Sequence, residues 1–202
     1  MEHMKRLVAA LRARGVDPLV VDAMARVPRH EFVTEAQRAR AYDDVALPIG
    51  HAQTISQPSL VGKMTSAARV NRLCRVLEIG TGCGYQTAIL AELASQVCTI
   101  ELEHALASAA AARLRRLGYR NIEPRVGDGH DGWARRGPFD AIVVTASALA
   151  VPPALVDQLR PGGRLVVPVG EELLLVAKDG RGRTSERFLG HVRFVPLRRT
   201  QS

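Results

Sequence analysis

The chain has 202 residues, of which 47% are hydrophobic and 4% aromatic, and its formal charge is +8 at pH 7. This length and apolar fraction predict a single domain, over residues 1–202, with a core of ordinary size. Its three cysteines are an odd number without metal-ligand spacing, which argues against a disulfide framework or a zinc site and favours a reducing, cytoplasmic setting.

The basic excess is scattered along the chain. Its densest group, residues 113–116, is not interleaved with aromatic side chains, so a solvated helix face explains it better than nucleic-acid binding. An acidic peptide or carboxylate substrate would also suit the charge. Residues 1–14 carry charges within their apolar run, unlike a signal peptide or a membrane span. We expect a monomer with no nucleic-acid or membrane partner and no metal.

Two short helices open the chain. Apolar periodicity predicts helices over 4–14 and 18–26, which are separated at Gly15. The segment from 27 to 58 holds several prolines and shows little periodicity. Irregular segments of that length in compact domains are often lids or binding loops, so we expect one here. A helix over 59–68 then leads to the first strand.

Strands and helices alternate through the rest of the chain. This alternation predicts an α/β fold, a Rossmann-like, doubly wound, mostly parallel sheet of about seven strands. A turn at 179–182 predicts an antiparallel C-terminal hairpin. Residues 1–70 then form a helical and loop extension of a core over 71–197. We expect strands over 75–79, 97–101, 122–126, 139–145, 164–169, 171–178 and 190–196, and helices over 86–95, 104–117 and 152–159.

A glycine-rich turn follows the first predicted strand. The strand contains Glu78, and Gly80, Gly82 and Gly84 come next at alternate positions, before a helix. Glycine lets a ligand approach the backbone, and a helix N-terminus adds unpaired N–H groups. The third glycine comes one place too early for the dinucleotide pattern Gly-x-Gly-x-x-Gly. The run instead resembles the acid-x-Gly-x-Gly-x-Gly pattern of S-adenosylmethionine (AdoMet) methyltransferases, in which Glu78 would face the methionine end and hold its ammonium group.

Two further carboxylates follow the next strands. Glu101 comes about 20 residues after the first glycine, a spacing at which an acid binds ribose hydroxyls. Asp128 could accept the adenine amino group, and Gly129 would let the ring lie close. Each signal alone is an ordinary turn or surface carboxylate. Their shared place at the ends of successive strands predicts a cofactor site.

More specific segments lie outside the glycine turn. Residues 27–33 read VPRHEFV, and residues 53–58 read QTISQP. Residues 161–170 read PGGRLVVPVG, and residues 192–197 read VRFVPL. Together these segments resemble the signature of the protein-L-isoaspartate O-methyltransferase family, and the resemblance extends over residues 4–197.

The resemblance implies transfer of the AdoMet methyl group to the α-carboxylate of L-isoaspartyl residues in damaged proteins or peptides, with S-adenosylhomocysteine as the other product. The methyl ester then collapses to a succinimide, and hydrolysis returns some normal aspartate. By position, Thr54, Ile55 and Ser56 belong to the loop that closes over cofactor and substrate, and Ser56 is the family's active-site serine. The positions that match the family's cofactor-binding residues are Gly80, Gly82, Gly84, Glu101, Asp128 and Gly129.

The expected acceptor needs little activation. A carboxyl group with a pKa near ~3.9 is already ionised at pH 7, so no general base is required. Alignment of the reacting atoms and exclusion of water are then the main tasks. We expect Ser56 to orient the substrate by hydrogen bonds, and not to act as a nucleophile.

The chain also departs from the family pattern. Ala52 replaces a usual glycine, and the stretch TASALA at 145–150 replaces TAAAPE. Two other interpretations therefore stay open: a methyltransferase of the same fold with a specialised peptide, RNA or small-molecule acceptor, and an AdoMet-binding module without turnover. Residues 151–154, VPPA, lack the acid amide and the aromatic of amino-directed nucleic-acid methyltransferases, which argues against a nucleic-acid acceptor.

Overall fold

The structure is a computed structural model that describes residues 2–199, so Met1 and residues 200–202 of the predicted domain lie outside the described residues. The strands are β1 (Leu47–Gly50), β2 (Gln53–Ile55), β3 (Arg75–Ile79), β4 (Gln96–Glu101), β5 (Ile122–Val126), β6 (Phe139–Val144), β7 (Leu159–Val169), β8 (Glu172–Lys178) and β9 (Thr184–His191). The helices are α1 (Glu2–Ala13), α2 (Pro18–Arg26), α3 (Pro58–Ala68), α4 (Tyr85–Leu93), α5 (His104–Arg116) and α6 (Pro153–Asp157), with 3-10 helices η1 (Arg29–Phe32), η2 (Glu35–Arg40) and η3 (Ala134–Arg136).

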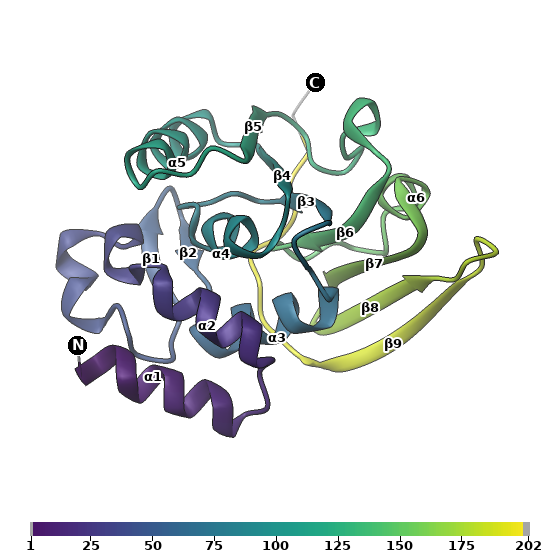
Figure 1. Cartoon of the computed structure of the whole chain (residues 1–202). Helices are drawn as coiled ribbons and strands as arrows, with labels where there is room; N and C mark the ends of the chain where they lie inside the picture. The colour runs from purple at the N-terminus through teal and green to yellow at the C-terminus, as the bar shows by residue number, and fades with distance from the viewer. Residues whose placement is uncertain (1, 200–202) are drawn as a thin grey trace.

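A seven-stranded sheet forms the centre of the molecule, in the order β5-β4-β3-β6-β7-β8-β9 (Figure 1). The strands from β5 to β7 are parallel to their neighbours, and β8 and β9 are antiparallel. This arrangement confirms the predicted mostly parallel sheet with its antiparallel hairpin. The chain places β4 and β5 on one side of β3 and β6 on the other, and sheets of this type bind ligands at such a switch point.

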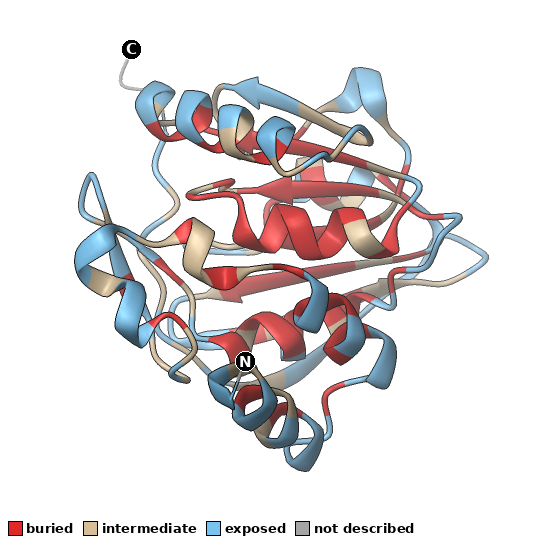
Figure 2. Ribbon diagram, turned by 60° about the vertical axis from the view of Figure 1, so that its left-hand side comes forward, coloured by how far each residue is buried: buried red, intermediate tan, exposed pale blue. Residues whose placement is uncertain are grey.

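Helices cover both faces of the sheet, so the central strands are almost fully buried (Figure 2). One hydrophobic cluster joins α3, α4 and the N-terminal helices to one face, through residues such as Val76 and Val166. A second cluster joins α6 to the other face, through Leu77, Leu155 and Leu165. None of the helices in the part of the chain that the structure describes has the length and apolar character needed to cross a bilayer.

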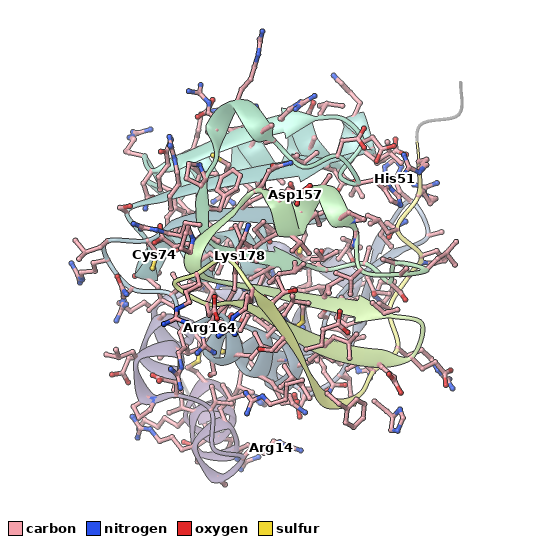
Figure 3. All side chains as sticks on the ribbon, turned by 90° about the vertical axis from the view of Figure 1, so that its right-hand side faces the viewer. Arg14, His51, Cys74, Asp157, Arg164 and Lys178 are labelled. Atoms are coloured by element: carbon pink, nitrogen blue, oxygen red, sulfur yellow. The ribbon has the colours of Figure 1, made fainter. Side chains whose placement is uncertain are left out.

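Three predicted boundaries were wrong. The last strand spans Thr184–His191 and not 190–196, because the predicted turn at Asp179 brings Thr184 directly opposite Lys178, and β9 then pairs along the whole of β8. Helix α6 ends at Asp157 and β7 begins at Leu159, not at 164, since the Phe139 N–H already bonds the carbonyl before β7. Lys178 then caps α6, with its Nζ 3.1 Å from the Val156 carbonyl oxygen (Figure 3).

The segment from 27 to 58 is more ordered than its sequence suggests. It forms η1, η2 and an antiparallel hairpin of β1 and β2. Gly50 pairs with Gln53 across the hairpin, so His51 and Ala52 form the connecting turn. Both have positive φ, +52° and +55°, as in the hairpin turns that favour Asn-Gly. The turn is therefore built from residues that adopt this conformation at a cost.

Ala52→Gly should stabilise the protein. Glycine removes the steric cost of the left-handed conformation but has more freedom to lose on folding, so we expect a net gain of about 0.5–1 kcal/mol. Urea unfolding measures this change. Ala150→Gly is the control, because Ala150 is exposed and lacks a positive φ, and should cost stability. Equal effects of the two substitutions would contradict the strain at Ala52.

Candidate active site

The parallel strands β3, β4 and β6 end at the same edge of the sheet. Ile79 pairs with Ile100 on one side and with Val144 on the other. The next residues are joined across this edge: the Gly80 N–H donates to the Ile100 carbonyl at 2.8 Å. Thr145 Oγ1 donates to the Gly80 carbonyl at 2.6 Å. A cavity opens here, and Ile79, Gly80 and Thr145 line it.

The glycine turn forms one wall of the cavity. Gly80 and Gly82 line the cavity and have φ of +94° and +54°, a region that side chains rarely adopt. A Cβ on Gly80 would lie 2.4 Å from Thr145 Oγ1, so the turn could not approach β6 with any other residue here. Gly84 is different, because it is not among the lining residues. It precedes α4 with φ of +90°, and its Cβ would lie 3.2 Å from Leu114 of α5.

Glu101 lines the cavity at the end of β4, as predicted, and is 9% exposed. Its Oε2 accepts the Gly82 N–H at 2.8 Å, and its Oε1 accepts the Glu103 N–H at 3.0 Å. These bonds fix the carboxylate between the glycine turn and the start of α5. Each oxygen can accept a further hydrogen bond, so Glu101 can still bind ligand hydroxyl groups.

Glu78 is fully buried and does not line the cavity. Its Oε2 accepts hydrogen bonds from Thr87 of α4 at 2.5 Å and from Thr99 of β4 at 2.6 Å. Burial raises the pKa of the Glu78 carboxyl to about 8, and the two threonine bonds oppose that shift. The side chain lies in the layer between β3 and α4, and its Oε1 has no hydrogen-bond partner among residues 2–199, so a role of Glu78 toward a ligand stays a prediction.

Asp128 and Gly129 follow β5 at the other end of the cavity. Gly129 lines the cavity, and its Cβ would lie 2.2 Å from Ile79 Cγ2, so only glycine suits this position. Asp128 is next to the lining residues Gly127 and Gly129 but is not one of them. Its Oδ1 accepts the His130 N–H and lies 2.8 Å from His130 Nδ1. The carboxylate is thus oriented by the following turn.

The hairpin covers the cavity on the opposite side. Thr54, Ile55 and Ser56 line the cavity together with the glycine turn, although they lie far from it in sequence. Arg29 fixes this segment: its Nη2 donates to the Ser56 carbonyl at 2.8 Å, and its Nε donates to the Ala41 carbonyl at 2.8 Å. The Arg29 side chain is fully buried, and this burial lowers its pKa.

Several parts of the cavity were not predicted from the sequence, among them Val61 and Met64 of α3. The C-terminal segment from Val195 to Arg198 lines it, although 190–196 had been predicted as a strand. Gln86 of α4 also lines it; its Nε2 donates to Thr65 Oγ1 at 2.9 Å. The Gln86 Oε1 is buried and has no hydrogen-bond partner among residues 2–199. The only sequence signal for Gln86 was its place in the first turn after the glycines.

Comparison with known proteins identifies the family. The model of the protein-L-isoaspartate(D-aspartate) O-methyltransferase family matches residues 2–202. The chain belongs to this family. A protein-L-isoaspartate O-methyltransferase 2 from Syntrophobacter fumaroxidans is 52% identical over 97% of the chain and 81% of its own length. One from Opitutus terrae is 52% identical over 98% of the chain and 86% of its own length.

Solved structures confirm the methyltransferase fold. A protein-L-isoaspartate O-methyltransferase matches with a TM-score of 0.88 and 28% identity, over 96% of this chain and 65% of the longer solved chain. A Plasmodium falciparum structure named for the same activity, in complex with S-adenosyl-L-homocysteine, matches with a TM-score of 0.83 and 26% identity. That match covers 97% of this chain and 98% of the other.

Glu78 should make the stability of the protein depend on pH. The folded carboxyl has a pKa of about 8 against an ordinary 4.5, so the folded state keeps a proton that the unfolded state loses. Stability should fall as pH rises from about 4.5 to 8, by up to ~1.4 kcal/mol per pH unit. Glu78→Gln cannot ionise and should lose this part of the slope. Urea unfolding at pH 5 to 8 measures both proteins, and parallel curves would contradict the raised pKa.

Proposed function

We propose that this protein transfers the methyl group of AdoMet to the free α-carboxylate of L-isoaspartyl residues in proteins or peptides. The observation that carries the proposal is the cavity in which the segment Thr54–Ser56 faces the glycine turn, in a chain of the isoaspartyl methyltransferase family. The extension over 1–70 shares a hydrophobic core with the strands over 71–197, which supports a single domain.

The cavity wall suits the cofactor. Gly80 and Gly82 expose backbone in the cavity wall, and Gly129 lets the chain after β5 lie directly against Ile79. The unpartnered Gln86 Oε1 is an acceptor that a buried N–H donor would satisfy. When bound, AdoMet supplies a methyl group on a sulfonium sulfur that is ready for transfer to a nucleophile.

The residues of the cavity can then be assigned to parts of the cofactor. We assign the methionine end to Gly80 and Gly82. Gln86 Oε1 and Glu78 Oε1 are both unpartnered among residues 2–199, and we assign the ammonium group to Gln86 because only Gln86 lines the cavity. Glu101 would hold the ribose hydroxyls, and Asp128 with Gly129 would hold the adenine. Gly84 contributes indirectly, because it lets α4 pack on α5 directly behind the turn.

Methyl transfer to a carboxylate requires alignment of the reacting atoms and exclusion of water. Transfer to a substrate carboxylate oxygen would form one bond to the methyl carbon as the bond from sulfur to that carbon breaks, so the cavity residues would have to move no proton. The covering segment keeps water out of the cavity. Ser56 is proposed to orient the carboxylate, and Arg29 fixes the Ser56 backbone by a hydrogen bond to its carbonyl oxygen. No general base is needed, because the acceptor is ionised at pH 7.

Glu101→Ala should weaken AdoMet binding by about 10- to 150-fold, because a hydrogen bond to a charged group contributes ~1.5–3 kcal/mol. Calorimetric titration with AdoMet measures the change. Glu172→Ala removes an exposed carboxylate from β8 and serves as the matched control. Equal affinities of the two variants would remove Glu101 from the proposed site.

The reaction itself is tested with paired peptides. Wild-type protein should methylate an isoaspartyl peptide and leave its normal-aspartyl twin unmodified. Ser56→Ala should lower kcat/KM by about 10- to 100-fold, since it deletes a bond to a charged substrate group. Ser185→Ala, an exposed serine of β9, is the control. Tight AdoMet binding without methylation of any isoaspartyl peptide would overturn the proposed function.

A further inference from the structure

A second groove opens beside the cavity. It has a volume of about 1120 Å³ and shares two lining residues, Thr54 and Val195, with the cavity. A chain that entered the cavity from this side would therefore pass along the groove. The cofactor residues Glu101 and Gly129 do not line the groove, so it is available to the acceptor.

Several segments form the walls of this groove. Residues 14–16, between α1 and α2, line it together with Leu60 and Lys63 of α3 and the chain from His191 to Val195, and residues 46, 54, 57 and 171 also contribute. Gly62 makes this possible, because a Cβ there would lie 2.9 Å from Val16 Cγ1. Figure 3 shows Arg14 extending from the N-terminal helices at the end of the molecule away from His51.

The groove combines an apolar floor with basic rims. Val16, Leu60 and Phe194 supply apolar surface. Lys63 and Arg193 are exposed and take part in no ion pair within residues 2–199. The Lys63 side chain extends to Gly190 of β9, since a Cβ built on that glycine would lie 2.9 Å from Lys63 Nζ.

The other charged residues that line the groove do not neutralise Lys63 and Arg193. Arg14 is already paired, with its Nη1 3.1 Å from Asp44 Oδ2. Glu171 is the acidic residue among the lining residues. Two unpaired cations against one carboxylate leave the groove with an excess of positive charge.

We propose that this groove receives the polypeptide on one side of the isoaspartyl residue, and that Lys63 and Arg193 favour acidic side chains there. This inference rests on the proposed function. A polypeptide suits an apolar floor with separate cations on the rim, because successive side chains of an extended chain point in opposite directions and can be apolar or charged. Ion pairs at exposed positions are weak and are screened by salt, so the preference is modest and depends on ionic strength.

The test uses isoaspartyl peptides that differ only in their flanks. One has neutral flanks, one carries two glutamates before the isoaspartyl residue, and one carries them after it. We expect one acidic peptide to show a KM about 2- to 10-fold below that of the neutral peptide at low salt, and the advantage to shrink at 0.5 M salt. Equal KM values for the three peptides would overturn the proposal.

Charge variants assign the preference to the groove. Lys63→Glu and Arg193→Glu should each reduce or reverse the ratio of KM values between the acidic and neutral peptides. Lys63→Gln, which only removes the charge, should reduce the ratio without reversing it. Arg181→Glu makes the same charge change on the exposed turn after β8 and should keep the wild-type ratio. The same shift in Arg181→Glu would mean a general charge effect and would overturn the role of the groove.

The neutral peptide separates the two proposals. If wild-type protein methylates it without preferring either acidic peptide, the proposed function stands and the groove assignment fails. If no isoaspartyl peptide is methylated although AdoMet binds, the proposed function itself fails.

Discussion

The buried carboxyl group of Glu78 connects the elements on which the cavity depends. It comes from β3 and accepts hydrogen bonds from Thr87 of α4 and Thr99 of β4. Thr99 Oγ1 also lies 2.6 Å from Thr81 Oγ1 in the glycine turn. One group thus fixes a strand, the next strand, the following helix and the turn between them. This buried network ties these elements together through Oε2 alone, since the Glu78 Oε1 has no hydrogen-bond partner among residues 2–199.

Arg29 fixes the covering segment, Thr54–Ser56, as Glu78 fixes the strand ends. A buried guanidinium is costly, and Arg29 reduces that cost through two short bonds to backbone carbonyls and a position 4.6 Å from the Tyr85 ring centroid. Tyr85 is the first residue of α4, so the same side chain contacts both the covering segment and the element behind the glycine turn. Arg29 therefore couples the covering segment to the helix behind the glycine turn.

Much of this arrangement could be predicted from the sequence, since strands, glycines and Glu101 follow local patterns. Glu78 could not be placed by motif alone, but the alternation of side chains along β3 puts it with Val76, on the face that α4 covers. The position of the C-terminal segment, residues 195–198, could not be predicted from local sequence patterns. Its position depends on bonds to Ser147, which joins the Val195 carbonyl and the Leu197 N–H at 2.8 Å each.

The departure at 145–150 lies within the same bonded stretch. Thr145 keeps its contact with Gly80, and Ala148 is buried against β7, with its N–H on the Pro168 carbonyl. The change reaches the surface at Leu149, which is fully exposed. The part of the cavity that Gly80, Glu101 and Thr145 line is thus built on strand ends whose register is fixed, whereas the part that residues 53–56 and 195–198 line is built on a hairpin, a loop and a tail. The second part is held against the first by side chains and not by sheet register: Arg29 on Ser56, Gln86 on Thr65, and Ser147 on the C-terminal segment.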